Sequence, residues 1–457
     1  MKAQKIGNLY DKLVWYLLFW CVFQDIALAA FLRVTGMVSL TKVLFFSKDI
    51  LLITLFFWAL IKSKLPRSYF GVCVIYCFIV FIQIFVTIIN SDTINYTSLL
   101  SSIRGLILLP TLTVIGYCIY DKEKFLSTIK RYYWFLAIIA VIGIVEFFCD
   151  IFFGTKSFWM DFLKLEDYYV AIKGQSGGIE NGTPGNWYTD IGKGYRTQKR
   201  LISIWAAPLT AGFVLLLPCM YYVINFLKNR KVINFKIQKA YLIDMFGAII
   251  CIIALVLTFT RQTLLPFLCV TVASFVYYNK KNRKIILVIG SILGISIIFL
   301  MKDKIIDYIF NGSTMVHIMR FKESFSQVNF WGSGIGSFGT RFAGSIATES
   351  QYVTVIGQTG VLTIIPYIYM LLYPIIYCRK KVRNVRDIAK PVICALCFSG
   401  LVFLAAGFVS ETVAAFTSIA QYYVFIGFAW GYCKKYKETN DYGKEDKDSG
   451  DVSATIS

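Results

Sequence analysis

Twelve apolar runs, most of them close to 20 residues long, recur along this 457-residue chain between short polar segments. About 20 apolar residues are enough to cross the hydrocarbon core of a bilayer as an α-helix. The pattern therefore predicts transmembrane helices at 14–33, 43–62, 69–89, 99–119, 132–153, 201–224, 242–258, 262–278, 284–301, 351–378, 391–409 and 412–432. Only residues 259–261 separate the seventh and eighth runs, so we expect a tight hairpin there.

Composition agrees with a membrane protein. Hydrophobic residues make up 57% of the chain and charged residues 16%, whereas a soluble domain carries about a quarter charged residues. The net charge of +21 could suggest nucleic acid, but the basic residues lie mostly in short loops between apolar runs, which favours membrane orientation instead. The 12 cysteines lie inside or at the edges of apolar runs, so we expect no disulfide framework and no metal or redox chemistry from them.

Lysine and arginine distinguish the two sides of the predicted membrane domain. They concentrate in alternate loops, at 62–67, 122–131, 228–239, 280–284 and 379–390. The positive-inside rule then places both termini in the cytoplasm and the two long loops, 154–200 and 302–350, outside. We read the first apolar run as a retained helix rather than a signal peptide. Residues 1–435 form the membrane domain, and we expect the polar tail 436–457 to be disordered.

Ionisable residues interrupt or flank several apolar runs, where burial makes them costly. They are Asp25, Lys48, Asp49, Arg104, Glu146, Arg261 and Glu411. In the predicted topology all of them lie in the outer half of their helix or at its outer end, and Asp244, near an inner end, is the exception. This one-sided distribution suggests a polar cavity open to the outside. The alternative is that Lys48 and Arg104 extend toward the interface and pair with the acids.

Arginine is also frequent outside, against the orientation bias. The candidates for one shared site are Arg104, Arg196, Arg200, Arg261 and Arg341. A guanidinium binds phosphate through a planar, bidentate fork that stays charged at any pH. We therefore expect an outward cavity for a lipid-linked phosphate or pyrophosphate, with Arg104, Arg200 and Arg261 converging on it. Contact with anionic lipid headgroups is the alternative.

The outer loops hold further candidates. Loop 154–200 carries aromatic residues that could stack on sugars or belong to the usual interfacial belt. They are Trp159, Tyr168, Tyr169, Trp187, Tyr188 and Tyr195. The glycine-rich stretch 332–336 lacks the context of a nucleotide loop, so we expect a flexible turn there. His317 is the single histidine and could serve as a base, but it cannot form a metal cluster alone.

Four short stretches carry a family likeness. They run from Arg200 to Pro208 with Gly212 beyond, from Leu257 to Thr263, from Gly332 to Gly336, and from Glu349 to Tyr352 with Gly360 beyond. With the predicted topology they resemble the O-antigen ligase and polysaccharide polymerase (Wzy-like) superfamily. The resemblance implies an all-α, GT-C-like architecture with about twelve transmembrane helices.

The resemblance also implies a metal-independent glycosyltransferase that uses no cofactor. Such enzymes transfer glycan from undecaprenyl pyrophosphate to an acceptor hydroxyl on the outer face of the bacterial cytoplasmic membrane, and other polysaccharide export proteins are expected partners. Arg200 and Arg261 match the two arginines that hold the pyrophosphate in the family. Ligases have a histidine where this sequence has Glu349, so a polymerase is favoured over a ligase. The base stays open among Glu349, His317 and Glu411.

A flippase or other transporter is the main rival from a different class. Transporters often contain paired repeats and helices broken at mid-depth. The sequence contains no convincing repeat, and two long outer loops are unusual for a carrier. These features favour the transferase.

Overall fold

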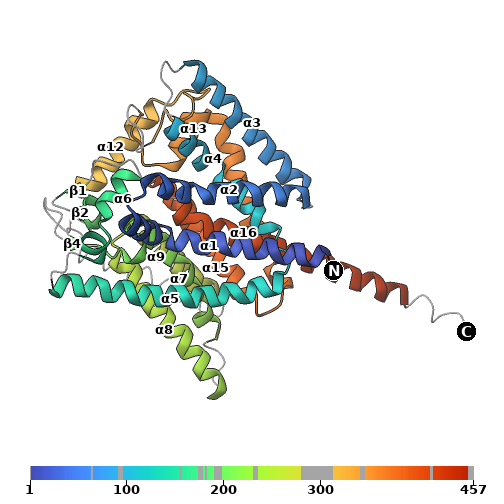
Figure 1. The fold of residues 1–457 in the computed structure, drawn as a ribbon. Coiled ribbons are helices and arrows are strands. Elements are labelled where there is room, and N and C mark those ends of the chain that lie inside the picture. Colours follow the sequence, from blue (N-terminus) through green and yellow to red (C-terminus); the bar gives the residue numbers. More distant parts are fainter. Residues whose placement is uncertain are drawn as a thin grey trace, which may run out of the picture.

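The computed structural model is an all-α fold in which most of the longest helices are gathered into one bundle (Figure 1). It describes residues 2–62, 65–90, 96–153, 157–172, 179–180, 183–189, 198–229, 235–278, 312–339, 345–411 and 415–450. The α-helices are α1 (Lys2–Thr35), α2 (Val38–Lys62), α3 (Arg67–Asn90), α4 (Tyr96–Tyr117), α5 (Lys122–Phe153), α6 (Leu165–Ala171), α7 (Pro208–Asn229), α8 (Phe235–Leu257), α9 (Arg261–Tyr278), α12 (Gly312–Ser326), α13 (Gln351–Thr359), α14 (Ile364–Lys381), α15 (Lys390–Ala406) and α16 (Phe416–Gly450).

Short elements connect these helices. The helical turns are η1 (Ser157–Phe162), η2 (Gly185–Trp187), η3 (Ser203–Trp205), η5 (Val361–Thr363) and η6 (Val382–Asn384). Two antiparallel ribbons form from β1 (Ile179–Glu180) with β2 (Thr183–Pro184), and from β3 (Tyr188–Thr189) with β4 (Gln198–Lys199). The second ribbon brings the end of loop 154–200 back toward its middle.

Seven of the described helices are long and apolar enough to cross a membrane: α1 to α5, α7, and α14 with its flanking turns. The shorter apolar helices α8, α9 and α15 and the first part of α16 coincide with further predicted runs. The predicted helix at 284–301 lies outside the described residues. The fold is therefore that of a multi-pass, all-α membrane protein.

The first part of α16, which is almost fully buried from Phe416 to Cys433, packs against α4 and α7 in the centre of the bundle. Helix α7 is 89% buried over its most apolar window, whereas α2 and α3 are only 22% buried and expose rows of large apolar side chains. Such exposure suits contact with lipid. Two glycines let α16 and α4 approach closely: a Cβ at Gly427 would collide with the carbonyl group of Thr113, and one at Gly116 with that of Val424. Small residues at helix contacts are typical of membrane proteins.

The two ends of the bundle differ in chemistry. Helix α1 begins and α16 ends on the same side (Figure 1), where Asp11 accepts hydrogen bonds from the backbone of residues 120 and 121, and Glu123 accepts one from Tyr432. We call this the basic end, because it also holds the Lys/Arg segment 379–390. The opposite end carries α6, η3, the α8–α9 turn and the segment 332–339, and we call it the loop end. The start of α1 and the end of α16 therefore share a side, while the membrane face that they occupy stays a prediction.

Two predicted helices and one predicted hairpin are arranged differently in the structure. Helix α7 begins at Pro208 rather than at 201, because Ser203 and Ala206 adopt positive φ angles and proline suits the first helical position. The run 351–378 breaks at Gly360 (φ 95°), where a Cβ would press on backbone atoms of Phe330 and Trp331.

The third difference concerns the predicted hairpin at 242–278. The turn at 258–260 is as short as expected, but α8 packs mainly against α7 and α5, while α9 packs against α15 and α7. The two helices are therefore joined by a tight turn, but each packs mainly against other helices of the bundle.

Helix α16 also extends into the segment 436–457, which was expected to be disordered. Its backbone is helical to Gly450, and residues 451–457 lie outside the described residues. An existing helix can lengthen without a new nucleation step, so a polar continuation costs little.

Candidate functional site at the loop end

An irregular segment, residues 200–207, lies at the loop end between α5 and α7. Two indole groups from loop 154–200 hold it: Trp159 Nε1 donates to Ser203 O (2.8 Å) and Trp187 Nε1 donates to Ala206 O (2.9 Å). Both accepting residues have left-handed backbone angles, with φ of 49° and 52°. Non-helical backbone near the membrane needs such protein partners, because lipid supplies no hydrogen bonds.

The aromatic residues of this loop form a small core rather than an open sugar platform. Trp159, Tyr168 and Trp187 are each at most 1% exposed, and they pack with Leu28 of α1 and Ile202. The Tyr168 hydroxyl group donates to Asp25 Oδ1 (2.8 Å). These side chains therefore fix the loop to α1 and to the segment 200–207. Tyr195 lies outside the described residues.

Arg200 clamps the turn between α8 and α9. Its Nε donates to Thr258 O (2.8 Å), its Nη2 to Thr260 Oγ1 (3.0 Å) and its Nη1 to Asn186 O (3.1 Å). The turn needs support, because Phe259 takes a left-handed φ of 46°, which is unfavourable for a bulky L-residue. Arg261 follows directly as the first residue of α9. The structure thus brings these two predicted arginines to one turn, residues 258–260, which we call the arginine turn.

Lys199, the residue before Arg200, anchors the same segment to α5. It is 7% exposed and forms an ion pair with Asp150 near the end of that helix. Burial lowers the pKa of the Lys199 ammonium group to about 8, and the negative charge of Glu146 opposes that shift. Two acids of α5 therefore hold the strand that leads into Arg200.

The arginine turn is linked to Glu411. Gln262 Nε2 donates to Val409 O (2.8 Å), in the turn that follows α15. Two residues later, Glu411 Oε1 lies 3.1 Å from Thr354 Oγ1 of α13. Glu411, a predicted candidate base, is therefore only two residues away from Val409, which contacts the first turn of α9.

A polar cavity of about 50 Å³ opens beside Glu411. Its polar lining comes from α4, α13 and the turn after α15: Ser101, Ser102, Gln351, Thr354, Gln358 and Glu411. Phe338 and the glycine beside it close the remaining side. Since one water needs roughly 10–15 Å³ of such space, the cavity has room for a few water-sized groups.

The glycine-rich segment 332–339 is fixed in place rather than flexible as predicted. Ser333 N donates to Gly357 O (2.8 Å), Ile335 N donates to Thr87 Oγ1 (2.5 Å), and Gln358 Nε2 donates to Phe338 O (2.6 Å). Residues 332, 334 and 336 have φ angles of 87°, 91° and 89°, which glycine adopts without strain. The glycines thus let this segment lie flat on α3 and α13 as a wall of the cavity.

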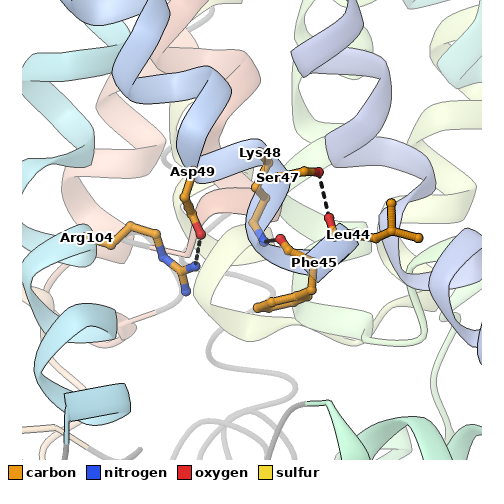
Figure 2. A network of polar contacts seen from close by, with 6 residues as sticks. All are labelled: Leu44, Phe45, Ser47, Lys48, Asp49 and Arg104. Carbon is orange, nitrogen blue, oxygen red and sulfur yellow. Dashed lines mark hydrogen bonds and ion pairs between the residues drawn. The ribbon is translucent and has the colours of Figure 1, made fainter. Parts of the chain in front are cut away.

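Arg104 belongs to a separate charge network between α4 and α2 (Figure 2). Its Nη1 lies 3.2 Å from Asp49 Oδ2, and each side chain is 22% exposed. Lys48, 3% exposed, donates to Phe45 O (2.6 Å) with its Nζ 3.5 Å from the centre of the Phe45 ring. Pairing of acids with bases, the alternative raised from the sequence, therefore describes Arg104 and Asp49. Arg104, Arg200 and Arg261 line neither the cavity beside Glu411 nor a second cavity between the end of α1 and α6, which is lined by Leu32, Lys164 and Asp167 among others.

The remaining candidates differ in how much the structure says of them. Glu349 Oε1 accepts a hydrogen bond from Arg320 Nη1 of α12 (2.9 Å). His317 also lies on α12, and its side chain lies outside the described residues, as do Arg196 and Arg341.

The amide and hydroxyl residues that line the cavity were not predicted as site residues, although their spacing in the sequence points to them. Gln351, Thr354 and Gln358 recur at i, i+3 and i+7 within an otherwise apolar run, which places them on one helix face.

No protein-family profile matches this chain, and no curated protein is similar to it. The functional argument therefore depends on the residues and the geometry.

Proposed function

We propose that this chain is a polysaccharide polymerase that joins undecaprenyl-pyrophosphate-linked repeat units on the outer face of the bacterial cytoplasmic membrane. The observation that carries the proposal is the arginine turn, in which Arg200 donates to the Thr258 carbonyl and to the Thr260 hydroxyl group, and Arg261 follows at the start of α9. A turn fixed by two helices can hold a cation at a constant depth, as a membrane-embedded leaving group requires.

The chemistry assigns complementary roles to the arginines and the acids. Planar guanidinium groups neutralise the charge that develops on a departing pyrophosphate. A carboxylate accepts the proton of the attacking sugar hydroxyl, and the candidates are Glu349, Glu411 and, as a neutral base, His317. The lipid tail confines the donor to the membrane, so little translational freedom is left to lose on binding. No metal or cofactor is needed for these steps.

The broader architecture is compatible with this proposal. The bundle of apolar helices carries its long loops at the loop end. The Lys/Arg asymmetry of the sequence predicts that this end faces outward. The same proposal includes a GT-C-like arrangement of about twelve helices with both termini in the cytoplasm. It also includes contact with other export proteins.

Deletion of the gene tests the function. Lipid-linked glycans extracted from the deletion strain should be single repeat units, because synthesis and export continue while joining stops. Completed chains on the lipid would indicate a ligase. Repeat units that accumulate on the inner face, protected from an impermeant glycosidase in intact cells, would indicate a flippase. Re-expression of the wild-type chain should restore long polymer.

A further inference from the structure

The second cavity at the loop end differs in size from the one beside Glu411. It lies between the end of α1, the start of α2 and α6, and its volume is about 280 Å³. Small-molecule sites begin at roughly 300 Å³, so this space is close to that of a ligand pocket. The cavity beside Glu411, at about 50 Å³, is much smaller. The larger cavity therefore has room for a small organic group.

Charged side chains of both signs line this larger cavity. Arg33 comes from the last turn of α1, Lys164 directly precedes α6, and Asp167 lies in the first turn of α6. All three are exposed, and none forms an ion pair with another residue that the structure describes. Two cations and one carboxylate are complementary to a ligand that carries both a phosphate and an ammonium group.

The rest of the lining is mainly apolar. Leu32 and Leu163 are 8% and 3% exposed, and both belong to the small core that joins α1 to loop 154–200. Val38, in the first turn of α2, lines the cavity as well. Apolar side chains beside charged ones suit an amphiphilic ligand better than a free ion.

Helix α2 offers apolar surface next to the cavity. Large apolar side chains are exposed along it at helical spacing, which places them on one face: Val43, Phe46, Ile50, Ile53 and Phe57. This stripe begins a rise of ~8 Å beyond Val38, which is shorter than an acyl chain. A lipid with its headgroup in the cavity can therefore lay its chains along α2, whereas a soluble ligand makes no use of this surface.

The backbone at Lys164 is held in an unfavourable conformation. Its φ of 47° and ψ of 59° lie in the left-handed region, which residues with a Cβ seldom adopt. Asp167 N donates to Lys164 O (3.1 Å), so the two charged residues are fixed relative to each other by a closed turn. Backbone strain of this kind is concentrated at binding sites.

We propose that this cavity binds the phosphoethanolamine headgroup of a membrane phospholipid. Arg33 and Lys164 bind the phosphate, and Asp167 accepts hydrogen bonds from the ammonium group. The bound lipid covers the core at Leu32 and Leu163 and so holds α6 against α1. The site uses neither arginine of the arginine turn, and it goes beyond the proposed polymerase.

Competition between defined lipids tests the headgroup. Full-length, delipidated protein in detergent is titrated with phosphatidylethanolamine that carries a fluorophore on one acyl chain, and unlabelled compounds displace it. We expect phosphatidylethanolamine to compete at least tenfold better than phosphatidylcholine, whose quaternary ammonium group has no hydrogen to donate to Asp167. Phosphatidylglycerol lacks the ammonium group and should compete severalfold less well. Glycerophosphoethanolamine has the headgroup without the chains and should compete at least 100-fold less well.

Charge variants assign the two parts of the headgroup. Lys164→Gln and Arg33→Gln should each weaken phosphatidylethanolamine and phosphatidylglycerol alike, by at least fivefold, because both lipids carry the phosphate. Asp167→Asn should weaken phosphatidylethanolamine severalfold and spare phosphatidylglycerol, so the preference between them disappears. The matched controls Lys42→Gln on α2 and Glu166→Gln on α6 change exposed charges that do not line the cavity, and should match the wild type.

The results separate a built site from a nonspecific lipid coat. Equal competition by the three phospholipids, unchanged in Lys164→Gln and Arg33→Gln, would overturn the proposal. Glycerophosphoethanolamine that competes as well as the lipid would also overturn it, because the ligand would then be soluble. Arg33→Gln lies in a regular helix, so it still tests the phosphate site if Lys164→Gln does not fold. None of these readouts needs polymer formation, so the polymerase can fail while the lipid site stands.

Discussion

Replacement of Arg200 by lysine tests whether its guanidinium fork holds the arginine turn. Lysine keeps the charge but can satisfy about one of the three acceptors that Arg200 contacts at 2.8, 3.0 and 3.1 Å. A hydrogen bond from a charged donor contributes about 1.5–3 kcal/mol, and partial exposure of Arg200 argues for less than the lower bound. Two lost bonds at ~1 kcal/mol each give ~2 kcal/mol, which corresponds to a ~30-fold increase in local opening.

Hydrogen exchange measures this opening directly. The amides of Phe259 and Leu264 donate within the turn, to Val256 O and Thr260 O, both at 2.9 Å. In nanodiscs, peptides that cover 257–264 should lose protection by ~30-fold in Arg200→Lys. The matched variant Arg104→Lys changes an arginine of another network and should leave these peptides unchanged. Equal protection in Arg200→Lys and wild type would refute the clamp, and equal loss in both variants would show a general destabilisation.

Three further predictions concern packing, charge and topology. Gly427→Val should prevent accumulation of folded protein, because a Cβ there collides with α4, whereas Gly71→Ala, with open space around it, should be neutral or slightly stabilising in a blot and thermal assay. A double-mutant cycle with Asp49→Asn and Arg104→Gln should give a coupling free energy of unfolding of about 1 kcal/mol, because the pair is only partly buried; additive effects would contradict the pairing. A cysteine at Ser176 should react with an impermeant reagent in intact cells, and protection until lysis would reverse the orientation.

Hydropathy predicts most of the helices because the lipid requires about 20 apolar residues per crossing. Because hydropathy is averaged along about 20 residues, it does not reveal a short break within a helix. The stretch 201–207 is apolar enough to resemble a helix, yet Ser203 and Ala206 take left-handed angles that the indoles of loop 154–200 stabilise. The break at Gly360 likewise depends on contact with residues 330–331, which are distant in sequence.

The candidate site shows a similar division. The sequence predicts that Arg200 and Arg261 share one region, because both lie beside helix ends on the same side of the membrane. It gives no sign that Arg200 donates to the backbone at 258, since a carbonyl acceptor is common to every residue type. The cavity could have been predicted in part from the spacing of Gln351 and Gln358, but its remaining side is closed by the segment 332–339, whose position depends on tertiary contacts.

Polymer formation by the purified Arg261→Lys protein tests the central claim most directly. The assay supplies lipid-linked repeat units to full-length protein in nanodiscs and resolves product length on a gel. Arg379→Lys, at the basic end, is the matched control. We expect long polymer from the wild type and the control and almost none from Arg261→Lys, because lysine keeps the charge and loses the planar fork that binds pyrophosphate. Polymer of normal length from Arg261→Lys and from Arg261→Ala, at equal protein abundance, would contradict the account.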